Sequence, residues 1–203
     1  MAHLVLETAP SIEPLVRDTT VKDHLRITQT DENDLLDRLI QAAREHLEDD
    51  TRRAVITQTW NLYLDAFPSS SATPILLPLP ALQSVGGDGG GFIKYYDQNN
   101  VLQTWSTDDY QVSITSLPGR ILPAHGEVWP TTYGILDAVQ IQFVCGYGDA
   151  VTDVPEKLRQ AMLLLIGSMY ENRESEVLTR EKLVVLRGEA AYTRLIMAER
   201  VWM

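Results

Sequence analysis

Histidine and cysteine are the side chains of this sequence that could bind a metal or pair as base and nucleophile. They are few and widely spaced: His3, His24, His46, His125 and Cys145. No two histidines have the His-x-x-x-His spacing that places both on one helix face, and a structural zinc site needs four converging nitrogen or sulfur ligands. The sequence therefore predicts no metal site and no cofactor.

Other combinations that could support catalysis also have simpler structural explanations. Cys145 ends an apolar segment, where a lone thiol is typically a small buried hydrophobe, and nothing beyond residue type pairs it with His125. The glycine-rich loop at 86–91 lacks the Gly-Lys-Ser/Thr ending of a phosphate-binding loop, so it is interpreted as a turn. We expect no catalytic residues and no enzymatic activity. A small hydrolase-like enzyme is a remote alternative that would need a converging polar pocket.

Charge excludes a further class of function. The chain has 17 lysines and arginines against 28 aspartates and glutamates, a net charge of −11. Proteins that bind the phosphate backbone of DNA need an excess of basic side chains. The first residues lack the basic segment followed by an apolar segment that is typical of a signal peptide. No apolar run approaches the roughly 18 residues that a membrane-spanning helix needs. We therefore expect a protein made in the cytoplasm, with no membrane partner and no specific binding to DNA.

Two segments have the apolar spacing of amphipathic helices. A helix is predicted over about 31–51, where apolar residues recur at i, i+3 and i+4 after an acidic start. A second is predicted over about 155–172, with Pro155 in its first turn. Their apolar stripes comprise Leu35, Leu36, Leu39, Ile40, Ala43 and Leu47 in the first, and Leu158, Ala161, Met162, Leu165, Ile166, Met169 and Tyr170 in the second.

Between the two helices the apolar pattern changes to a period of two. Segments rich in β-branched and aromatic residues, separated by glycine and proline, predict a small antiparallel β-subdomain. Prolines on both sides of residues 75–77 favour an edge strand there. The predicted fold is α+β, a helical core with an inserted β-subdomain. Its parts are an N-terminal arm (1–18), the helical core (19–53 and 153–175), the β-subdomain (54–148) and a C-terminal helical or extended tail (176–203).

The tail differs in charge from the rest of the chain. Residues 179–203 contain five basic and three acidic residues, while the remainder is strongly acidic. A basic tail with an apolar, aromatic end suggests a segment that meets another surface. The composition equally allows a final helix that packs on its own body.

The order of these parts, with several short motifs, resembles a known family. Over residues 19–175 the chain is similar to the head–tail connector (adaptor) proteins of tailed double-stranded DNA phages and prophages. The glycine loop at 86–91 and the tail after residue 175 depart from the family pattern. The motifs that carry the resemblance are Val21–Ile27, the acidic-capped helix with Leu35–Ala43, Gln58–Trp60, Leu64–Pro68, Ile75–Pro80, Tyr110–Val112, Arg120–Pro123, Trp129–Pro130, Phe143–Gly148, Val154–Pro155 and Tyr170–Glu174.

The resemblance implies a structural virion protein located in the neck and assembled in the host cytoplasm. Such connectors form a ring, typically dodecameric, that docks under the portal, extends the DNA channel and contacts a downstream neck or tail protein. We predict that the tail docks on the portal through Leu195, Ile196 and Trp202, because apolar and aromatic anchors often dominate interface energy. Another neck component, a stopper or a tail-terminator ring, is the nearest alternative and would be mainly β.

Overall fold

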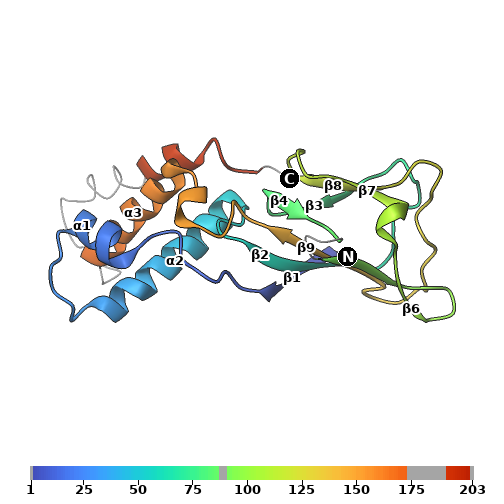
Figure 1. Ribbon diagram of the computed structural model, residues 1–203, viewed down its shortest axis with the longest axis horizontal. Helices are drawn as coiled ribbons and strands as arrows, with labels where there is room; N and C mark the ends of the chain where they lie inside the picture. Colours follow the sequence, from blue (N-terminus) through green and yellow to red (C-terminus); the bar gives the residue numbers. More distant parts are fainter. Residues whose placement is uncertain (1, 87–90, 173–190, 202–203) are drawn as a thin grey trace. The chain divides into compact units, whose positions relative to one another are not determined.

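The structure is a computed structural model that describes residues 2–86, 91–172 and 191–201. Contacts divide the chain into two compact units. Unit 1 comprises residues 1–10 and 57–147, and unit 2 comprises residues 11–56 and 148–203. Antiparallel sheets make up unit 1 and helices dominate unit 2 (Figure 1), so the predicted α+β fold class is confirmed.

Unit 1 contains a six-stranded antiparallel sheet. Its strand order is β1-β2-β9-β5-β6, and β4 also pairs with β9. The central strand β9 alternates between buried and partly exposed residues: Val139, Ile141, Phe143 and Cys145 are all 0% exposed. The strands are β1 (Ala2–Thr8), β2 (Gln58–Leu64), β4 (Leu82–Ser84), β5 (Phe92–Tyr96), β6 (Leu102–Thr104) and β9 (Val139–Cys145).

A second, three-stranded antiparallel sheet has the order β3-β8-β7. Its strands are β3 (Ile75–Leu77), β7 (Tyr110–Ser113) and β8 (Gly119–Pro123), and β7 follows a short 3₁₀ turn, Thr107–Asp109. The predicted edge position of residues 75–77 is confirmed. The two sheets approach closely where β8 meets β4. A Cβ on Gly119 would lie 2.6 Å from a methyl carbon of Leu82, so a larger residue there would have to displace the Leu82 side chain.

An aromatic cluster fills the core of unit 1. The ring of Phe67 stacks on that of Trp129 with centroids 5.2 Å apart, and Trp105 lies 5.7 Å from Phe67 and 5.3 Å from Tyr110. The indole N–H of Trp129 donates to Ser70 O at 3.1 Å, which satisfies its polar edge. Aromatic side chains bury large apolar areas, so this cluster holds the loops of unit 1 in place.

Unit 2 is built on two packed helices. In α2 (Asn33–Thr51) the apolar stripe Leu36, Ile40, Ala43 and Leu47 is at most 2% exposed. It packs against α3 (Glu156–Glu171), whose Leu158, Ala161, Met162 and Ile166 are fully buried. The described part of unit 2 also contains a π-helical turn (Arg17–Val21), the short helix α1 (Lys22–Leu25), a 3₁₀ turn (Val151–Asp153) and helical residues 191–196.

The ends of α2 and α3 lie within two residues of the predicted 31–51 and 155–172. Asp31 and Glu32 precede α2, and Pro155 stands immediately before α3. The N-terminal arm needs a larger correction, because residues 2–8 form β1 at the edge of the six-stranded sheet. This strand obtains its hydrogen bonds from β2, more than fifty residues away, so local sequence did not reveal it. Most of the predicted tail, residues 176–190 and 202–203, lies outside the described residues.

Candidate functional site

The histidines and the cysteine do not form a reactive centre in the part of the chain that the structure describes. Cys145 is fully buried in β9, and His125 is exposed in the turn after β8. No group of three or more His, Cys, Asp or Glu residues among the described ones could hold a metal ion. Among the described helices, none has both the length and the apolar character needed to cross a membrane.

Several basic side chains of unit 2 pair with carboxylates of the same unit. The guanidinium of Arg44, 8% exposed, lies between two carboxylates and donates to Glu13 and Glu48 at 2.9 Å each. Burial alone would lower the pKa of Arg44. The nearby carboxylates of Glu13 and Glu48 have the larger effect, so the net result is a raised pKa. This arrangement ties the segment before α1 to α2 and leaves Arg44 occupied within its own unit.

The described part of the C-terminal segment packs on the end of α2. Arg200 Nε donates to Asp50 O at 2.8 Å, and Val201 N donates to Thr51 O at 3.1 Å. These are two of the last four carbonyls of α2, which have no partner within the helix. The Tyr192 hydroxyl donates to Asp50 Oδ2 at 2.9 Å, so burial and this hydrogen bond raise the pKa of Tyr192. Residues 191–201 therefore act as a C-cap for α2.

This packing bears on the residues that were predicted to dock on the portal. Ile196 is 3% exposed, buried within unit 2, and Leu195 is partly exposed. Trp202 lies outside the described residues. Docking through these three residues stays a prediction, and an interface that uses Ile196 requires residues 191–201 to leave the end of α2.

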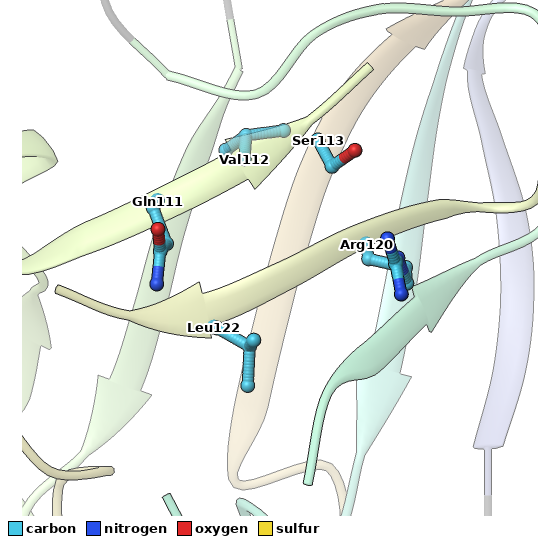
Figure 2. A pocket seen from close by; sticks show the side chains of 5 residues that line it. All are labelled: Gln111, Val112, Ser113, Arg120 and Leu122. Atoms are coloured by element: carbon cyan, nitrogen blue, oxygen red, sulfur yellow. The ribbon is translucent and has the colours of Figure 1, made fainter. Parts of the chain in front are cut away.

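Unit 1 presents an open sheet face with a shallow hollow of about 220 Å³. The residues that line it come from β7 and β8 (Figure 2): Gln111, Val112, Ser113, Arg120 and Leu122. Gln111 donates its amide N–H to Pro123 O at 3.1 Å, which holds the side chain across the two strands. No carboxylate among the described residues lies within ion-pair distance of Arg120.

Residues 19–78 match the model of the phage gp6-like head-tail connector protein family. The resemblance to phage head–tail connectors is confirmed. The matched segment contains α1, α2, β2 and β3. It thus runs from unit 2 into unit 1 and includes several of the motifs on which the resemblance was based. A search of curated proteins finds no match.

Solved structures extend the likeness to nearly the whole chain. A chain in the structure "Neck of empty GTA particle computed with C6 symmetry" aligns with a TM-score of 0.76 and 22% identity, over 99% of this chain and 96% of the other. A chain of "Virion of native gene transfer agent (GTA) particle" gives 0.75 and 22%, over 98% and 96%. A chain of "Neck of native GTA particle computed with C12 symmetry" gives 0.70 and 20%, over 98% and 96%. This chain thus shares its fold, through both units, with chains of these particles.

Two surfaces were missed by sequence reasoning. The cap at the end of α2 depends on contacts between residues that are about 150 positions apart in the sequence, so no local sequence pattern predicts it. The sequence contains only a weak indication of the sheet face around Arg120. Unit 1 has two basic residues, Lys94 and Arg120, against eight acidic ones.

Proposed function

We propose that this protein is a non-enzymatic structural subunit of the neck of a tailed-phage-like particle, a head–tail connector. The match of residues 19–78 to a connector family carries the proposal. The fold shared with chains of gene transfer agent necks and virions supports it, because those alignments cover nearly all of both chains. The helical pair α2–α3 favours an adaptor over the mainly β stopper and terminator rings.

The connector works as a ring, which we take to be dodecameric. Two of the similar chains come from necks computed with C6 and C12 symmetry, which is consistent with cyclic assembly. A cyclic ring needs a heterologous interface, in which one face of each copy meets a different face of the next. The ring docks under the portal on one side and meets a downstream neck or tail protein on the other.

The acidic charge of the chain suits a DNA channel. At −11 per copy, a ring carries a large negative charge, and acidic surface facing a lumen repels phosphates. DNA then passes without being held, whereas a basic lumen would bind it by releasing counterions.

The C-terminal tail provides the portal contact in this proposal. Leu195, Ile196 and Trp202 are its apolar anchors, and the segment is less acidic than the body. Because Ile196 is buried against unit 2, docking exchanges the cap on α2 for the portal surface. Removal of the chain from residue 179 onward is expected to abolish portal binding, and normal binding by the truncated protein would remove this part of the proposal.

The decisive experiment is electron microscopy of the full chain mixed with its portal. We expect a ring stacked coaxially on the portal, and light scattering of the chain alone will show whether the ring needs the portal as a template. A gel shift with duplex DNA at low salt is expected to show no complex. A chain that stays monomeric with the portal present, or one that turns over a small molecule, would overturn the proposal.

A further inference from the structure

One end of the three-stranded sheet combines exposed apolar side chains with Arg120. We call Leu76, Ile114, Leu117 and Arg120 the Arg120 patch. The three apolar residues are 49%, 50% and 60% exposed, respectively. Leu76 and Arg120 are direct partners across β3 and β8, so their side chains share one face of the sheet. Ile114 and Leu117 lie in the connection between β7 and β8, within six residues of Arg120 in the sequence. Exposed apolar residues near an arginine are typical of a protein–protein interface.

The hollow beside the patch gives this surface its shape. Arg120 and Leu122 project from β8 next to Gln111 and Ser113 of β7 (Figure 2). The opposite face of the same sheet is closed, because Ile75, Leu77 and Ile121 are at most 6% exposed. One face thus belongs to the core of unit 1, and the other is open and able to receive a side chain.

Charge defines what the patch can bind. Lys94, the other basic residue of unit 1, lies 4.1 Å from the ring centroid of Phe92, a contact within its own strand. Arg120 is therefore the positive group that this acidic unit offers to a partner. A segment that presents a carboxylate beside an exposed apolar side chain is complementary to the patch, because it supplies both the charge and the apolar contact.

The chain itself carries such a segment on the same unit. Glu127 and Val128 follow β8 in an exposed turn, where Val128 is 67% exposed. The turn is rigidly supported, since Glu127 N donates to Ala124 O at 3.0 Å and the next residue, Trp129, is anchored in the aromatic core. No basic residue in the described part of the chain pairs with Glu127.

We propose that copies of this chain dock unit 1 to unit 1, with the Glu127–Val128 turn of one copy on the Arg120 patch of the next. The two surfaces lie toward opposite ends of β8, roughly 13 Å apart along the strand. Each copy thus presents a donor surface and a different acceptor surface. This is a heterologous contact, which generates a closed ring when the rotation between copies closes.

The inference rests on the proposed ring, and charge reversal tests it separately. Arg120→Glu and Glu127→Arg are each expected to raise the concentration needed for ring assembly about tenfold, because each places like charges in contact. The double variant restores the pair in the opposite sense and is expected to assemble within about threefold of the wild type. Mass photometry of the full chain, alone and with portal, measures these shifts.

Disulfide trapping provides the second measurement. Ile114→Cys and Val128→Cys are made as separate proteins and mixed under mild oxidation, so that a bond between them can form only between copies. Native Cys145 is fully buried and provides an internal control. The matched control mixes Ile114→Cys with Val101→Cys, because Val101 is an exposed valine too, at 51%, but lies outside the proposed contact. We expect at least about tenfold more cross-linked dimer from the designed pair.

The outcomes separate this inference from the proposed function. Rings that form normally in both charge-reversal variants, or single defects that the double variant does not rescue, overturn the self-docking. Reversals that spare the ring but release another neck protein would assign the patch to that protein and also overturn it. A wild-type chain that forms no ring even with portal would overturn the proposed function, and this inference with it.

Discussion

The two units of this chain use charge in opposite ways. Unit 2 carries fifteen basic and twenty acidic residues, and several of them pair within the unit, as Arg44 does with Glu13 and Glu48. Unit 1 carries two basic and eight acidic residues, and its interior is held by apolar strands and an aromatic cluster. Ion pairs therefore contribute to the folding of unit 2. In unit 1 the engaged carboxylates mainly accept hydrogen bonds, as Asp97 does from Gln103, and Arg120 has no ion-pair partner among the described residues.

This difference suits the proposed connector, in which acidic surface would repel DNA while other surfaces assemble. An acidic unit whose fold does not depend on ion pairs keeps its structure when salt changes, because apolar burial is not screened by ions. Unit 2 needs its ion pairs to join segments from both ends of the sequence. Four substitutions test this contrast.

Removing an aromatic side chain from unit 1 should have the largest effect on stability. Trp129→Ala deletes a ring that stacks on Phe67 and lies near Trp105, so we expect a loss of about 3–5 kcal/mol in the free energy of unfolding. Thr131→Ala, at a nearby exposed position, is the control. Denaturant unfolding measures both, and equal stability of the two variants would contradict the importance of the cluster.

Breaking the Arg44 ion pairs should have the next largest effect. Arg44→Met leaves the carboxylates of Glu13 and Glu48 without their cation, so we expect unfolding to become easier by about 2 kcal/mol at neutral pH. Arg38→Met, on the exposed face of the same helix, should change stability by less than about 0.5 kcal/mol. If the two variants have the same free energy of unfolding, the stability of unit 2 does not depend on the Arg44 ion pairs.

The cap on α2 gives a smaller effect that depends on pH. Tyr192→Phe removes the hydroxyl that donates to Asp50, for an expected loss of about 1 kcal/mol at neutral pH. The pKa of Tyr192 is raised in the folded state, so the unfolded chain loses this proton first as pH rises above about 10. The stabilisation from Tyr192 therefore declines in alkaline solution. The wild type should approach the Phe variant there, and a constant difference between them from pH 7 to alkaline pH would contradict the account.

Arg120 should have the smallest effect on folding. Arg120→Met removes an exposed guanidinium with no ion-pair partner among the described residues, so we expect a change below about 0.5 kcal/mol in the free energy of unfolding. Ring assembly of the same protein should still weaken. A large loss of stability would show that Arg120 belongs to the fold of unit 1 rather than to an interface.

Elements with strong periodic patterns could be predicted from the sequence. The apolar stripes predicted the bounds of α2 and α3 to within two residues. The prolines around residues 75–77 predicted the edge position of β3. Two strands were missed, β1 and β4. Both are held by partners distant in sequence, since β1 pairs with β2 and β4 with β9. Residues 191–201 remained ambiguous for the same reason.

By itself, the amino-acid sequence determined the α+β class, the two amphipathic helices, the acidic character and the connector resemblance, because periodicity, composition and ordered motifs are local properties. Tertiary structure alone decided the strand order of the two sheets, the cap that residues 191–201 form on α2 and the exposure of Arg120 on an open sheet face. These features depend on which distant segments meet. Hydrogen-bonding edges and apolar faces accept many partners, and only the folded chain selects one.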